Sequence, residues 1–250
     1  MRSKMEVIPV HLKEDVSAKH DLVKLIISSI KKQRQQLRNG DILVVAHKIV
    51  SKAEGRTVDL NSVKPSKRAI AIAKKHAKDP RVAELILKES KRIVKMKRGI
   101  IIVETKHGFV CANAGIDQSN VYGYRAALLP ANPDRSAGKI RAEIKKRTGK
   151  NIAVIITDTF GRPFREGQVD VAIGISGLKP IKDYRGLKDM FGKELKVTEI
   201  AVADEIASTA ELVMGKFNRI PATIIRGFRY ENKQGSAKEL IRKREKDLFR

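Results

Sequence analysis

The chain has 250 residues and a formal net charge of +25, from 53 Lys and Arg against 28 Asp and Glu. With 42% hydrophobic residues it is long and apolar enough to form a sizeable core, which rules out a disordered or fibrous chain. The single cysteine, Cys111, rules out an internal disulfide, and no Cys/His cluster has zinc spacing. A balance this basic favours anionic partners.

The sequence predicts no membrane partner. No apolar run approaches the about 20 residues of a membrane-spanning helix, and the first residues lack the hydrophobic region of a secretory signal. We therefore expect a cytoplasmic protein. Aromatic residues are only 4%, without Trp, and do not alternate with basic residues as in base-stacking surfaces. Nucleic-acid binding is thus weakly supported, and the basic residues are interpreted mainly as solvated helix faces.

Helical and strand-like segments alternate in the first half of the chain. Apolar spacing distinguishes the helices from short buried strands. In chain order, the predictions are a helix (21–38, ended by Gly40), a strand (41–46), two Lys-rich helices (66–76 and 82–94, separated at Asp79-Pro80), a strand (99–104) and a Gly- and Asn-rich stretch (107–123).

The alternation continues in the second half, and the sequence predicts a mixed α/β (α+β) fold. The predictions are a helix (134–148, ended by Gly149), a strand (151–157), a loop (158–167), an apolar segment (169–175), an irregular stretch to 196, a helix (204–214), a strand (221–226) and a last helix opened by Ser236 and Glu239. No repeat or linker marks a boundary. We expect one catalytic domain over 1–250, with a possible inner lobe at about 66–146.

The segment NIAVIITDTFGRPFR (151–165) is the first candidate for chemistry. Its strand is expected to deliver Asp158 and Thr159 at its carboxyl end, where open α/β sheets place ligand sites. A carboxylate beside a hydroxyl suits a hard cation, and Arg162 and Arg165 supply forks for phosphate or carboxylate. The alternative is a turn-capping Asp with two surface arginines.

A second candidate is CANAGIDQSNVYG (111–123), in which Asp117 and Asn120 offer a carboxylate and an amide three residues apart. Asp117 and Asp158, from separate loops, could jointly hold one or two Mg²⁺ ions that bridge phosphate oxygens. The alternative is an ordinary polar loop.

The third candidate is DILVVAHKIVSKAEG (41–55), a buried strand that runs into His47, Lys48 and Lys52. Lysine is a good point charge for a nucleotide phosphate, whereas His47 is most simply a turn residue. There is no Walker A pattern, so a nucleotide site must be of another type. There is also no G-x-S-x-G elbow and no obvious base near Cys111 in sequence, so covalent nucleophilic catalysis is not favoured.

Together these segments resemble one family over most of the chain. The stretches GDILVVAHKIVSKAEGR, ANAGIDQSNV, TDTFGRPFREGQVDVAIGISGLKPIKDYRG, ADEIASTAELVMGK and IPATIIRGF occur in the order found in the coenzyme F-420:L-glutamate ligases. The third stretch is the most specific, because it is long and shares little with general nucleotide motifs.

The resemblance implies a GTP-dependent ligase that adds L-glutamate to the lactyl carboxylate of the deazaflavin precursor, first one residue and then a second through a γ-linkage. The γ-phosphate of GTP would activate the carboxylate as an acyl phosphate, with two divalent cations, Mg²⁺ or Mn²⁺, and K⁺ as a possible helper. It also implies a homodimer of two-lobed chains, with mixed sheets flanked by helices.

The resemblance also implies roles for individual residues. Asp117, Asp158 and Thr159 match metal ligands. Given the implied reaction, we further expect Arg162 and Arg165 to hold the acyl phosphate or the coenzyme phosphodiester. The positions that match the family's nucleotide-binding residues are Ile8, Pro9, Val10, His11, His47, Lys48, Lys52, Asn120, Met214, Gly215 and Lys216.

Lys216 departs from the family, which places an amide or acid there to help hold a metal. Either a second ion has one ligand fewer, or Lys216 contacts phosphate directly. Two other readings stay open: a metal-dependent phosphohydrolase using the same aspartates, and a basic nucleic-acid-binding protein.

Overall fold

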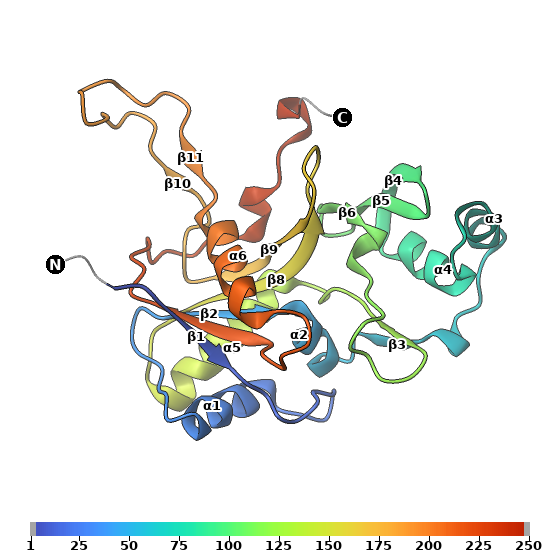
Figure 1. Cartoon of the computed structure of the whole chain (residues 1–250), viewed down its shortest axis with the longest axis horizontal. Coiled ribbons are helices and arrows are strands. Elements are labelled where there is room, and N and C mark those ends of the chain that lie inside the picture. Colours follow the sequence, from blue (N-terminus) through green and yellow to red (C-terminus); the bar gives the residue numbers. More distant parts are fainter. Residues whose placement is uncertain (1–3, 248–250) are drawn as a thin grey trace.

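The computed structural model describes residues 4–247, and a five-stranded sheet forms its centre (Figure 1). Strands β2 and β8 are parallel, and the other neighbours in the sheet are antiparallel. The strand order is β1 (Glu6–Val10), β12 (Ala222–Arg226), β2 (Ile42–Ala46), β8 (Ala153–Gly161) and β9 (Gln168–Ser176). The predicted mixed α/β fold is confirmed.

Helices cover this sheet and bury its apolar residues. Helix α5 (Pro133–Thr148) packs against β8 and β9, α1 (Leu22–Lys32) packs against α5, and α6 (Val202–Met214) lies across β9, β12 and β1. Strand β2 (ILVVA) and the first half of β8 are buried, because the helices shield these two strands from water. The large hydrophobic core cluster lies here.

A second, smaller hydrophobic cluster lies within residues 58–128, on the right of Figure 1. The elements of this part of the chain are β3 (Thr57–Asp59), α3 (Lys67–His76), α4 (Pro80–Lys88), β4 (Ser90–Lys97), β5 (Ile100–Thr105), β6 (Val110–Ala112) and β7 (Arg125–Ala127). Helix α2 (His47–Ala53) precedes them, and its Ile49 and Val50 belong to the large cluster. Strands β4, β5 and β6 form one sheet and β3 pairs with β7. The proposed inner lobe at 66–146 stays a prediction; α5, within that range, packs on the central sheet.

Several helix ends follow from their capping residues. Asp21, Ser66, Asp79 and Asn132 each accept a backbone hydrogen bond at the start of α1, α3, α4 and α5. Gly149 ends α5 with a left-handed backbone, as predicted. These short polar side chains satisfy N–H groups that the first turn leaves free.

Two helix boundaries were predicted wrongly. Helix α1 ends at Lys32, not 38, because Arg34 takes a left-handed backbone and Gly40 instead lies in the turn before β2. The helix predicted over 82–94 ends at Lys88. Residues 90–94 belong to β4, because Ile93 and its neighbours pair with β5 and this pairing overrides their helical spacing.

The predicted loop 158–167 is also wrong in its first part. Strand β8 continues through Asp158 and Thr159 to Gly161, because β9 pairs with it antiparallel along this length. The capping box of Ser236 and Glu239 is present, but it opens only a short 3₁₀ helix, Ala237–Leu240. Further 3₁₀ turns are Leu60–Ser62, Asn113–Gly115 and Arg244–Lys246.

The stretch predicted as irregular forms an arm, defined here as residues 181–200, with a short antiparallel pair at its base, β10 (Lys182–Asp183) and β11 (Glu199–Ile200). Figure 1 shows the arm extending away from the central sheet.

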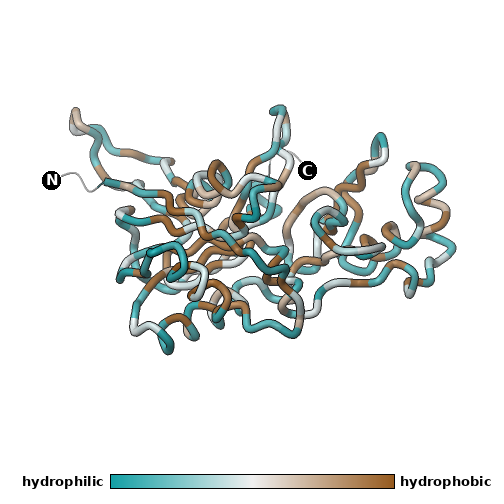
Figure 2. Tube along the Cα trace, turned by 60° about the horizontal axis from the view of Figure 1, so that its bottom comes forward, coloured by the Kyte–Doolittle hydropathy of each residue, from teal (hydrophilic) through white to brown (hydrophobic). Residues whose placement is uncertain are grey.

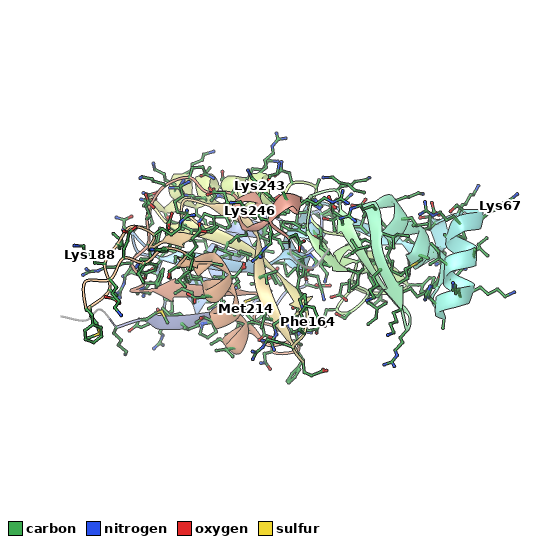
Figure 3. All side chains as sticks on the ribbon, turned by 90° about the horizontal axis from the view of Figure 1, so that it is seen from above. Lys67, Phe164, Lys188, Met214, Lys243 and Lys246 are labelled. Carbon is green, nitrogen blue, oxygen red and sulfur yellow. The ribbon has the colours of Figure 1, made fainter. Side chains whose placement is uncertain are left out.

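Hydrophobic residues run through the interior of the trace while hydrophilic ones dominate its outer turns (Figure 2). Basic side chains such as Lys67, Lys188, Lys243 and Lys246 are exposed on the outside of the molecule (Figure 3). None of the helices formed by residues 4–247 has the length and apolar character needed to cross a membrane.

Candidate active site

Asp158 is held in place by the first residue of helix α2. Strand β2 runs parallel to β8, and Ala46 pairs with Thr157. The residues that follow, His47 at the start of α2 and Asp158 in β8, therefore also lie side by side. His47 Nε2 lies 3.2 Å from Asp158 Oδ1, and the ring is 3% exposed. The other ring nitrogen lies 3.4 Å from Ser51 Oγ, one turn further along α2. The buried imidazole therefore orients the Asp158 carboxylate.

Asp117 is held by the second residue of the same helix. Lys48 Nζ lies 2.6 Å from Asp117 Oδ2, and the backbone N–H of Ser119 donates to Asp117 Oδ1 at 2.6 Å. Burial alone would raise the pKa of Asp117, but hydrogen bonds from Lys48 and Ser119 outweigh it and lower that pKa. Since His47 and Lys48 are consecutive, the start of α2 contacts both predicted metal-binding aspartates.

Thr159 faces a different set of partners. Its hydroxyl donates to Asp170 Oδ1 at 2.6 Å, and Thr157 donates to Asp170 Oδ2 at 2.9 Å. Lys216 Nζ donates to Thr159 Oγ1 at 2.8 Å and lies 3.4 Å from Asp170. Burial would lower the pKa of Lys216, but the charges of Asp170 and Glu211 raise it overall.

Sequence reasoning missed Asp170. Its side chain is only 6% exposed, and it lies in β9 within the run QVDVAIGIS. The sequence did contain one signal, a carboxylate inside an otherwise apolar strand, because a buried charge needs partners nearby. Its partners, on β8 and after α6, are distant in sequence and could not be read from it.

Asn120 connects the loop of Asp117 to the chain around Lys216. Its Nδ2 donates to the backbone oxygen of Lys216 at 3.2 Å, which joins the loop of Asp117 to the chain just after α6. Figure 3 labels Met214, the last residue of α6, and Phe164, in the loop between β8 and β9. Four segments thus form the candidate site: the start of α2, the last part of β8, the residues just after α6 and the loop of residues 117–120.

Other predicted residues lie in different surroundings. Lys52 Nζ pairs with Asp15 at 2.6 Å, and Arg162 donates to the backbone oxygen of Glu166 within its own loop. Arg165 is exposed in the same loop, and Met214 is buried. Residues Ile8, Pro9 and Val10 belong to β1, with His11 exposed just beyond it and Gly215 exposed after α6.

Comparison with known proteins decides the family. The family model described as F420-0:Gamma-glutamyl ligase matches residues 13–227. The chain belongs to this family. The resemblance predicted from the sequence is confirmed, and membership makes the protein an enzyme of the ligase class.

Relatives named coenzyme F420:L-glutamate ligase match most of this ligase. The protein of Methanocaldococcus jannaschii is 53% identical over 216 residues, covering 86% of each chain. That of Methanothermobacter thermautotrophicus is 49% identical over 238 residues, or 94% of each chain. That of Methanopyrus kandleri is 44% identical over 251 residues and covers 98% of each. The family match at residues 13–227 includes β8, β9 and α6, which carry the site.

The donor atoms of the ligase suit a hard divalent cation. Asp117 and Asp158 offer carboxylate oxygens and Thr159 a hydroxyl oxygen, the ligand type that Mg²⁺ prefers. Within residues 4–247, no group of three or more His, Cys, Asp or Glu side chains is gathered as a metal site. Asp158 and Asp117, which contact consecutive residues at the start of α2, suit an ion whose other ligands come from substrate phosphates and water.

Cys111 does not fit the role of nucleophile in this ligase. Burial, and then the nearby charge of Asp158, raise the pKa of its thiol to about 12. At neutral pH the group is a thiol and not a thiolate, which is the nucleophilic form.

Proposed function

We propose that the protein is a GTP-dependent ligase that joins L-glutamate to the carboxylate of the coenzyme F420 precursor, first one residue and then a second through a γ-linkage. The observation that carries this proposal is the contact of His47 and Lys48, two consecutive residues, with Asp158 and Asp117. In a chain of this family, paired carboxylates beside lysines supply the charges that phosphoryl transfer needs.

The proposed reaction has two steps. A carboxylate oxygen of the acceptor attacks the γ-phosphorus of GTP, the bond to the β-phosphate oxygen breaks, and GDP leaves. The amine of glutamate then attacks the acyl carbon, the carbon–oxygen bond to phosphate breaks, and the nitrogen loses its proton to solvent. Inorganic phosphate and an amide are the products.

The chain supplies positioning and charge for these steps. Asp117, Asp158 and Thr159 would hold Mg²⁺ or Mn²⁺, and such an ion neutralises charge on phosphate oxygens. Lys48 lies beside Asp117 and is proposed to bind the same phosphates, while His47 contacts Asp158 and would keep it in position. Arg162 and Arg165 lie in the loop that follows β8 and are proposed to hold the anionic acceptor. K⁺ as a helper remains part of the proposal.

Mass spectrometry of the full chain incubated with the glutamate-free coenzyme, GTP, L-glutamate and Mn²⁺ tests the proposal. We expect a GTP-dependent gain of one or two glutamyl units. GDP release without product would keep the nucleotide site and reject this acceptor. Neither product nor GDP, together with salt-sensitive binding to DNA or RNA, would reject the ligase and favour the basic nucleic-acid-binding reading.

Lys52→Ala is expected to raise the KM for GTP by about 10-fold or more, since a hydrogen bond to a charged group contributes roughly 1.5–3 kcal/mol. Lys52 is 10% exposed and now pairs with Asp15, which is 73% exposed, so a phosphate can replace that partner. Steady-state kinetics with varied GTP measure this. Asp15→Asn is the control and should leave KM unraised. Equal effects of both variants would show that Lys52 acts only through the ion pair.

We also propose that the protein is a homodimer joined through the arm of residues 181–200. Large hydrophobic side chains are exposed on it: Leu187 (55%), Met190 (90%), Phe191 (81%) and Val197 (86%). A two-stranded hairpin is marginally stable alone, so burial against a second copy would stabilise it. The arm carries five basic and four acidic residues (5 − 4 = +1), so it repels a second copy little although the chain carries +25.

The dimer is tested by light scattering after size exclusion. The wild type is expected at twice the 27.9 kDa of one chain. The double variant Met190→Ser with Phe191→Ser is expected at the mass of one chain. Ile70→Ser, on α3 and 49% exposed, is the control and should remain dimeric. A double variant that stays dimeric would exclude the arm as the interface.

A further inference from the structure

The ammonium group of Lys216 lies among oxygens from three elements of the site. Nζ is 2.8 Å from Thr159 Oγ1, 3.1 Å from Glu211 Oε1 and 3.4 Å from Asp170 Oδ1. Two of these oxygens belong to carboxylates and one to a hydroxyl. Such hydroxyl and carboxylate oxygens are the ligands that a hard metal cation prefers.

Asp170 explains why a cation is held here. Its carboxylate is 6% exposed, and a buried carboxylate without a compensating charge is strongly unfavourable. The two hydroxyls that donate to it, from Thr157 and Thr159, are neutral. In the described part of the chain, Lys216 is the one cationic side chain within ion-pair distance of Asp170.

Thr159 links this carboxylate to the predicted metal position. Because its hydroxyl hydrogen is directed to Asp170, its lone pairs are free to accept, and Lys216 donates to one of them. A divalent ion on the same oxygen would lie within a few ångströms of the ammonium, and like charges at that separation repel strongly. The lysine and a second ion therefore compete for one place.

We infer that Lys216 is a built-in cation of the site, held by Thr159, Asp170 and Glu211, so that one divalent ion and not two binds with the nucleotide. The ion at Asp117 and Asp158 is retained without Thr159 as a ligand, because the Thr159 hydroxyl binds the ammonium in place of a second ion. The ammonium then supplies the second positive charge. This inference rests on the proposed nucleotide site. It would give the chain one divalent ion fewer than the two that the family resemblance implies.

Counting bound Mn²⁺ tests the inference without any turnover. The full chain is saturated with GDP and titrated with Mn²⁺, and free Mn²⁺ is followed by electron paramagnetic resonance. We expect one equivalent for the wild type and a second for Lys216→Met, in which Asp170 and Glu211 lose their cation. Adding Asp170→Asn to Lys216→Met should return the count to one, because Asp170 then carries no charge.

Two results would overturn the inference: two equivalents bound by the wild type, or one equivalent bound by Lys216→Met while its far-ultraviolet circular dichroism matches the wild type. That variant is expected to fold, since the Lys216 side chain is 56% exposed. Failure of the wild type to bind GDP and Mn²⁺ together would overturn the nucleotide site and this inference with it. The two failures are thus distinguishable in one titration.

Discussion

Replacing Asp158 by Asn is expected to lower kcat by about 10²- to 10³-fold, the loss typical when one preorganised electrostatic contact to a transition state is removed. The asparagine has nearly the same shape but no charge, so it would bind a divalent ion far more weakly. It can still meet the buried ring of His47, which lies 3.2 Å from the carboxylate. The variant should therefore remain folded, and the loss should appear in turnover with glutamate, GTP and the F420 precursor.

Asp189→Asn provides the matched control for this result. Asp189 lies on the arm, and its carboxylate accepts only backbone hydrogen bonds from Phe191 and Lys193 among the contacts described. We expect this variant to keep the wild-type kcat. If Asp158→Asn kept the full rate as well, the metal assignment would be wrong. If it lost its circular dichroism signal, His47 and Asp158 would instead be a structural pair, and Asp117→Asn would become the test of the metal.

The parts of the fold that the sequence predicted are those set by local patterns. Strand β2 and helices α5 and α6 follow from continuous apolar runs, helical spacing and the cap at Gly149. The errors lie where a distant segment decides. Residues 90–94 have helical spacing but pair with β5, and Asp158 continues β8 because β9 pairs with it. No local pattern carries that information.

The candidate site, too, could be predicted from the sequence only in part. Asp117, Asp158 and Thr159 could be selected because their residue types suit a cation, and the adjacency of His47 and Lys48 was visible. The contacts that position these side chains could not be predicted, because they join segments that are far apart in the chain. Asp170 is 46 residues from Lys216, and Asn120 is 96 residues from it.

A second large effect is expected far from the chemistry, at the start of β2. Asp41 is 1% exposed and accepts hydrogen bonds from Arg226 Nε at 2.9 Å and Nη2 at 2.7 Å. The pair joins β2 to β12, its neighbour in the sheet. Asp41→Asn removes the carboxylate that pairs with the Arg226 guanidinium, which is 11% exposed and then keeps only the weaker attraction of Glu6. We expect the free energy of unfolding to fall by about 3–5 kcal/mol. Urea unfolding measures it.

The double variant Asp41→Asn with Arg226→Met separates the cost of an unpaired charge from the contribution of the pair. Neither charge is then buried, so most of the lost stability should return, since apolar replacements of buried ion pairs are often neutral. Asp183→Asn, at an ion pair whose side chains are 47–48% exposed, should leave stability almost unchanged. If Asp41→Asn cost no more than Asp183→Asn, solvent would be reaching Arg226. The strand that delivers His47 and Lys48 to the site would then depend on its apolar residues alone.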